Sequence, residues 1–231
     1  MVSRFFVLLL LTGVGAIFVS LMFGYVPDDA LNLTARYYAE NTVRDTGAAN
    51  IVAAIVVTFR GLDTLGEVTV LFLTAAIVGL VLAGSQQGRL RREQPAPGEL
   101  LVTGTRLLVP LILLLGVYVF VNGHLTPGGG FQGGAILASA ILMLLLADPL
   151  REFSHRLISV IESISGLLFV AVGLLGMVYA GGFLDNRILP LGTLGDLISA
   201  GAIPVIYSFI GLKVGAEFSS MMVNLSETEE P

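Results

Sequence analysis

Ionisable side chains inside or beside long apolar segments are the residues of this sequence that could do chemistry. A charged group in the hydrocarbon of a membrane costs at least about 2.5 kcal/mol, so each one needs a structural or functional reason. The groups in question are Asp63, Glu67, His124, Glu162, Lys213 and Glu217. Carboxylates, imidazoles and amines that change protonation state are the usual parts of proton and cation paths in membranes.

Asp63 and Glu67 open one apolar segment with two carboxylates one helical turn apart. Thr64 and Glu67 have the spacing of a capping box, and Asp63 suits the N-cap beside the positive end of a helix. The other interpretation is a cation or proton station near one membrane face. Capping is the favoured interpretation for Asp63, and both stay open for Glu67.

Lys213 and Glu217 lie four residues apart, so a helix would place them on one face where they could pair. Lys213 falls near the middle of its apolar segment, too deep to reach water by a simple change of rotamer. A buried structural bridge and a lysine–carboxylate proton relay agree equally well with this spacing.

His124 ends another apolar segment, and no second ligand lies at metal-binding spacing from it. Hydrogen bonding at an interface is therefore favoured over a role in gating or proton transfer. We expect Glu162, near the end of its apolar segment, to be solvated.

The composition identifies a membrane protein. Of 231 residues, 55% are hydrophobic and only 13% are charged, against about 25% charged in soluble domains. The apolar runs are long and continuous, which favours helices over the alternating strands of a barrel. Cysteine is absent, which excludes disulfides and thiolate-held metal centres in this chain. The sequence predicts an all-α, multi-pass protein of the cell inner (cytoplasmic) membrane.

About six transmembrane helices are predicted, since each crossing needs about 20 apolar residues. They cover residues 5–25, 64–84, 106–122, 131–147, 158–180 and 199–222. Residues 50–59 are too short to cross and predict a short re-entrant or interfacial helix that ends before Gly61. Part of the polar stretch 28–50 is expected to form an amphipathic surface helix.

Residues 85–104 are polar and basic and contain two prolines, so they predict a linker. It separates two modules. The module at 1–84 has two transmembrane helices, and the module at 105–231 has four transmembrane helices and an acidic tail. Arginines concentrate in the loops on the side of the linker. The positive-inside rule then places the linker and both chain termini in the cytoplasm.

A glycine-rich corner, residues 123–134, joins the third and fourth predicted transmembrane helices. Pro127 must end or bend the arriving helix, because it lacks an N–H group. The glycines allow a sharp turn and close helix packing. Residues 128–133 also satisfy G-x-G-x-x-G, but no strand precedes them and no ribose-binding acid follows in a βαβ unit, so they are not a nucleotide site.

The corner HLTPGGGFQGG, residues 124–134, resembles the hallmark of the MnhB-type subunit of Mrp-type multisubunit sodium/proton antiporters. Residues 194–201 and 211–217 are similar to the same subunit in membrane-bound hydrogenase relatives. The segment FRGLDTLGE, residues 59–67, resembles the R-G-x-D-T-x-G-E motif at the C-terminal end of the large antiporter subunit. In hydrogenase-type complexes that end is a separate small subunit. The chain thus resembles a fusion of two neighbouring antiporter subunits.

The resemblance implies a membrane subunit of a Na⁺/proton antiporter module, stand-alone or within a hydrogenase-related respiratory complex, that contributes to the ion path. It implies other antiporter-module subunits and hydrogenase or ferredoxin-linked redox subunits as partners, and Na⁺ and H⁺ as transported ions. The alternative is a structural subunit that bridges antiporter and partner subunits without conducting ions. We expect no cofactor, metal or nucleic acid on this chain, and any redox catalysis to reside in other subunits, because no catalytic motif is present.

The resemblance also marks functionally sensitive positions, among them Asp63, Glu67, His124, Pro127 and Phe131. Together with the pair on the last helix, the candidates for the ion or proton path are Asp63, Glu67, His124, Lys213 and Glu217. The residues expected to shape the motifs are Arg60, Gly61, Pro127, Gly128, Gly129, Gly130, Phe131, Gly133 and Gly134.

Overall fold

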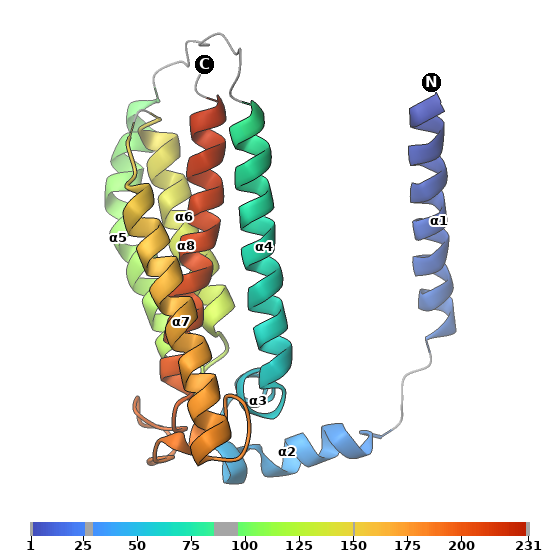
Figure 1. Cartoon of the computed structure of the whole chain (residues 1–231), viewed down its shortest axis with the longest axis vertical. Helices are drawn as coiled ribbons and strands as arrows, with labels where there is room; N and C mark the ends of the chain where they lie inside the picture. The colour runs from blue at the N-terminus through green and yellow to red at the C-terminus, as the bar shows by residue number, and fades with distance from the viewer. Residues whose placement is uncertain (1, 26–29, 86–96, 150, 230–231) are drawn as a thin grey trace. The chain divides into compact units, whose positions relative to one another are not determined.

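The computed structural model describes residues 2–25, 30–85, 97–149 and 151–229, and these fold into helices without any β-strand (Figure 1). The chain forms two units, residues 1–37 and 38–231. The first unit contains α1 (Val2–Gly24) and the beginning of α2 (Leu33–Thr46).

The second unit is a bundle built around one helix, α8 (Ile203–Glu229), which contacts each of the other long helices. Those neighbours are α4 (Gly61–Ser85), α5 (Glu99–Val121), α6 (Gly130–Ala147) and α7 (His155–Tyr179). Short elements gather at one end of the bundle, namely α3 (Ile51–Ala54), the π-helix η1 (Ile55–Phe59) and the 3₁₀-helix η2 (Asn186–Ile188). We call this the corner end, because the glycine-rich corner lies there, and the opposite end, where α8 finishes, the tail end (Figure 1).

Five of the described helices, α1, α4, α5, α6 and α7, are long and apolar enough to cross a membrane. The pair formed by α2 and α3–η1, bent by 85°, would add one more if it crossed as a broken span. The 27 residues of α8 also suffice for a crossing, and its lower hydropathy reflects the charged residues Lys213 and Glu217. The prediction of an all-α membrane protein with about six such helices is confirmed, while the orientation of the termini stays a prediction.

Two helices begin furthest from their predicted starts. The α5 helix begins at Glu99, inside the stretch expected to be a linker, whose residues 86–96 lie outside the described part of the chain. The α8 helix begins at Ile203 rather than at 199. Residues 192–202 stay irregular, because Gly192, Gly195 and Gly201 adopt positive φ angles that a helix does not contain.

The short helix predicted at 50–59 is present as α3 and η1. Hydrogen bonding changes to the wider π pattern at its end, where the Arg60 N–H donates to the carbonyl of Ile55 at 2.8 Å. The Thr64 hydroxyl donates to the carbonyl of Val56 at 2.5 Å and ties this turn to α4. Gly61 is needed between them, because a Cβ there would lie 2.9 Å from the carbonyl oxygen of Phe183.

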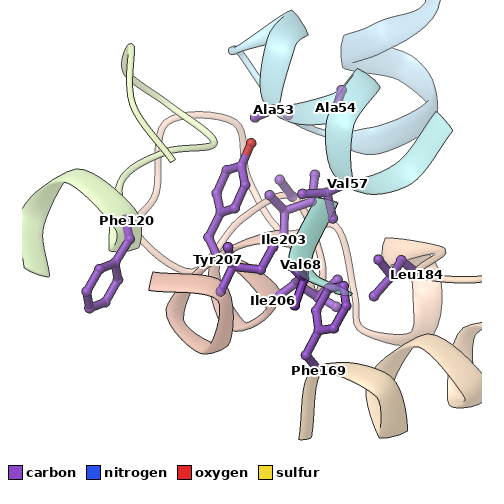
Figure 2. Close-up of a cluster of buried hydrophobic side chains, with 14 of the residues drawn as sticks. Ala53, Ala54, Val57, Val68, Phe120, Phe169, Leu184, Ile203, Ile206 and Tyr207 are labelled. Atoms are coloured by element: carbon purple, nitrogen blue, oxygen red, sulfur yellow. The ribbon is translucent and has the colours of Figure 1, made fainter. Parts of the chain in front are cut away.

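The hydrophobic core lies at the corner end. Figure 2 shows Ala53, Ala54 and Val57 of the short helices close to Ile203, Ile206 and Tyr207 at the start of α8. Further buried side chains come from the long helices and from the loop before η2, namely Val68, Phe120, Phe169 and Leu184. Apolar burial therefore fixes the start of α8 against the rest of the bundle. Because α8 is one continuous helix, its packed start also sets the position of the polar residues further along it.

Candidate functional site

The Lys213–Glu217 pair lies inside the bundle. The Lys213 Nζ is 2.8 Å from Oε1 of Glu217, and the two residues are only 8% and 0% exposed. Among the described residues neither oxygen of Glu217 accepts a hydrogen bond of regular geometry, so the contact is an ion pair without further support. Lys213 lies about ten residues, or roughly 15 Å, along α8 from Ile203, the first residue of this helix.

A groove between α4 and α7 reaches the lysine. Its volume is about 250 Å³, and Lys213 lies among its lining residues. The Lys213 Nζ also sits 5.0 Å from the ring centroid of Phe72 on α4, a cation–π distance. The other lining residues come from the same two helices: Leu65, Val68, Thr69, Glu162, Ser163, Gly166, Leu167, Phe169 and Val170.

Asp63 and Glu67 lie on the outward face of α4 and do not join the pair on α8. Asp63 forms an ion pair with Arg60, and both side chains are more than half exposed, at 53% and 61%. Such an exposed pair contributes little stability, about 0–1 kcal/mol in water. Glu67 is exposed as well. These two predicted stations therefore lie on the surface of the chain, apart from the buried Lys213–Glu217 pair.

His124 lies at the corner end and is fully buried. Its Nε2 is 3.3 Å from the carbonyl oxygen of Asp196, and its Nδ1 has no regular hydrogen bond within the described residues. Burial lowers the pKa of His124 below the ordinary value of 6.5, against the smaller raising effect of the carbonyls of Asp196 and Val121. The ring is therefore neutral at neutral pH. His124 lies at the corner end, where α8 begins, and Glu217 lies near the middle of that helix.

The corner glycines have two structural roles. Gly128 and Gly129 adopt φ angles of +150° and +154°, which side-chain-bearing residues rarely adopt. The next three let α6 approach its neighbours. A Cβ at Gly130 would lie 2.6 Å from the Cβ of Ile210, one at Gly133 would lie 2.7 Å from the carbonyl oxygen of Gly116, and one at Gly134 would lie 2.7 Å from that of Gly211.

Pro127 and Phe131 flank these glycines. Pro127 is exposed in the turn between α5 and α6, after the arriving helix has ended at Val121. Phe131 lies in the first turn of α6 and packs against the hydrophobic core.

The sequence analysis missed two asparagines that hold the corner end together. Asn50 donates from Nδ2 to the carbonyls of Gly123 at 2.8 Å and Thr126 at 3.0 Å, while its Oδ1 accepts from the first amides of α3. Asn186 is fully buried and donates to the carbonyls of Thr46 and Ala200. An asparagine just before a helix is an N-cap signal, which could have singled out Asn50. Nothing in the local sequence marks Asn186.

Comparison with protein families gives two matches that together cover nearly the whole chain. Residues 100–220, more than half of the chain, match the domain related to the MnhB subunit of Na⁺/H⁺ antiporters. Residues 3–103 match the MbhE family, which is described as one of the subunits of MBH. An uncharacterized protein of Methanocaldococcus jannaschii is 32% identical over 204 residues, which are 77% of each chain.

Two solved structures share the fold. A chain of the membrane-bound sulfane sulfur reductase, an archaeal respiratory membrane complex, is 40% identical with a TM-score of 0.78, over 97% of this chain and 98% of that one. A chain of the Mrp complex from Dietzia sp. DQ12-45-1b is 30% identical with a TM-score of 0.77. That match covers 97% of this chain but only 26% of the longer Mrp chain.

The fold and the buried ion pair define a helical, multi-pass membrane subunit. The chain belongs to the family of domains related to the MnhB subunit of Na⁺/H⁺ antiporters, here preceded in one polypeptide by an MbhE-type segment. The resemblance to a fusion of two antiporter-type subunits is thereby confirmed. The exact division at 85–104 stays a prediction.

Proposed function

We propose that this chain, as a membrane subunit of a cation/proton antiporter module or a related respiratory complex, provides part of the ion path through its Lys213–Glu217 pair. The family membership and the similarity to chains of two membrane complexes support the parent assembly. Other antiporter-module subunits and redox subunits are the proposed partners, and H⁺ and Na⁺ the proposed ions.

The observation that carries this proposal is the placement of an unsupported ion pair deep in the bundle. Burying two charges costs several kcal/mol per ion, and replacing such a pair by apolar residues is often neutral or stabilising. Stability alone therefore gives a weak reason for an amine and a carboxylate at this depth. Proton exchange gives a stronger one, because both groups can change their protonation state and the groove gives the lysine a connection out of the bundle.

Asp63 and Glu67 are proposed to act at an interface rather than inside this chain. Glu67 lies in the second turn of α4, on a face that also exposes Val70 and Leu73. A carboxylate on an otherwise apolar membrane surface requires a polar partner. We assign that role to a neighbouring subunit, which would continue the path from Glu67.

A structural role is the second candidate, and the corner end favours it. The hydrogen bonds of Asn50 and Asn186 join the segment before 85 to the segment after 105, and the glycine contacts of α6 pack this helix against α5 and α8. A protein that tethers its neighbours needs such a junction. In this case the polar residues of α4 and α8 would be caps and bridges only.

Proton movement in vesicles that contain the whole complex tests the proposal through the variant Glu217→Gln. Glutamine keeps the size and polarity of the side chain and removes its charge. We expect transport to be lost while assembly on a native gel is retained, and Asp148→Asn, an exposed acid at the end of α6, to leave both unchanged. Normal transport by Glu217→Gln would favour the structural role.

A further inference from the structure

The groove between α4 and α7 contains, besides Lys213, the ionisable residue Glu162, to which the proposed function gives no role. It lies on α7, seven residues after His155, so about 10 Å of helix separates it from the tail end. Its side chain is half-buried among the lining residues of the groove. It forms no ion pair in the part of the chain that the structure describes. The structure places Glu162 in the wall of the groove, and its access to solvent stays a prediction.

Lys213 thus forms an ion pair with Glu217 on its own helix and shares its groove with Glu162 on α7. Glu217 holds the ammonium at 2.8 Å, and Glu162 lines the same groove as the lysine. The three groups come from two different helices; Lys213 and Glu162 line the groove, and Glu217 is the buried partner of Lys213. When two carboxylates lie near one ammonium, a proton gained by one of them changes the affinity of the other for the ammonium.

The surface of α7 next to Glu162 is shaped to receive the lysine. Gly166 follows Glu162 by one helical turn, and a Cβ at Gly166 would lie 3.3 Å from Cδ and 3.4 Å from Nζ of Lys213. The absence of a side chain at this position lets the lysine lie against α7. Thr69 and Ser163 add hydroxyl groups to the lining. A volume of about 250 Å³ also leaves room for several waters, each of which takes roughly 30 Å³ in the liquid.

We propose that Glu162 is the proton-exchange residue of this groove and delivers protons to the Lys213–Glu217 pair. This inference rests on the proposed function. In the first step an N–H bond of the Lys213 ammonium breaks and an O–H bond forms on Glu217, which leaves a neutral amine and a neutral acid. In the second step the protonated Glu162 gives its proton to the amine, directly or through one water, and the ammonium is restored. The net result is one proton moved from Glu162 to Glu217, with no electron transferred.

The test measures proton movement by the whole complex in vesicles at a series of pH values. The variants are Glu162→Gln, Glu162→Asp and Glu152→Gln. The last is the matched control, because Glu152 is an exposed acid just before α7 and does not line the groove. We expect Glu162→Gln to lower the rate at least about a hundredfold, the lower end of the range for a lost general acid or base. Glu162→Asp should recover part of the rate with a displaced pH profile, and Glu152→Gln should match the wild type.

Comparison with Glu217→Gln separates the failure of this inference from the failure of the proposed function. If Glu162→Gln transports normally while Glu217→Gln is inactive, the role of Glu162 is overturned and the ion pair remains on the path. If both variants transport normally, both proposals are overturned. Should Glu162→Gln fail to assemble, Glu162→Asp decides the question, because it keeps the charge. A wild-type rate and pH profile in that variant would contradict the exchange role.

Discussion

Polar residues are buried at the corner end and in the middle of α8, and the two places satisfy them differently. At the corner end, Asn50 and Asn186 donate to backbone carbonyls at 2.7–3.0 Å. In the middle of α8, Lys213 and Glu217 form an ion pair with each other, and Glu217 accepts no regular hydrogen bond from the described residues. A backbone carbonyl cannot leave its place, whereas a charged side chain can exchange its partner or its proton.

This difference separates a locked region from a region that can change state. Hydrogen bonds to the backbone hold one geometry, and losing one partner leaves the other unsatisfied at a cost of about 1–3 kcal/mol. An ion pair beside a groove has at least two protonation states that differ little in shape. The corner end therefore positions the bundle, and the middle of α8 is the place to look for ion movement.

The largest expected effect on stability comes from Lys213→Met, which breaks the ion pair. It leaves the fully buried Glu217 without a counter-charge, and breaking a buried pair costs about 3–5 kcal/mol. Unfolding of the purified complex by heat or denaturant measures this. The double variant Lys213→Met/Glu217→Leu should recover most of the loss, because no charge remains buried. A single variant as stable as the wild type would show that Glu217 is already neutral or finds another partner.

Asn50→Ala should have an intermediate effect, confined to the corner end. It removes two hydrogen bonds to the corner and the cap of α3, which together correspond to about 1–3 kcal/mol. Asn122→Ala is the matched control, since its side chain makes a single longer bond of 3.3 Å to Tyr118. We expect Asn50→Ala to lower the unfolding temperature while transport per assembled complex stays near wild type. Lost transport in a stable complex would place the corner itself on the path.

His124 should give the smallest effect, visible only on acidification. Its pKa is lowered by burial in the folded chain, so below about pH 6.5 the unfolded chain binds more protons than the folded one. Stability is therefore intact above that pH and decreases as the pH falls below it. In His124→Gln this part of the pH dependence should disappear, which unfolding measurements at a series of pH values would detect. An unchanged acid response would assign it to other groups.

The sequence was sufficient for the fold class and for the Lys213–Glu217 pair, because both depend on local pattern. Apolar runs of membrane length predict helices, and a spacing of four residues predicts a shared helix face. The direction of that face was not accessible from the sequence. Glu67 is also an ionisable residue of an apolar segment, yet its side chain is exposed. The buried positions in this part of α4 are those of Thr64 and Val68.

Contacts between distant segments explain the remaining differences. Glu162 shares a groove with Lys213 only because α7 packs beside α8. Asn186 donates a hydrogen bond to the carbonyl of Thr46, which lies 140 residues earlier in the sequence. The glycines at 130, 133 and 134 were recognised as packing residues, but their partners on α5 and α8 depend on the tertiary arrangement. Local spacing carries none of this information.

The most direct test of the ion-path claim is proton movement by the complex that carries Lys213→Met/Glu217→Leu. Because this double variant keeps the volume of the interior and buries no charge, it should assemble and remain stable, which removes misfolding as an explanation. The ion-path account predicts that its transport falls to the background of empty vesicles. Transport at the wild-type rate would contradict it and would leave the chain as a structural link between its neighbours.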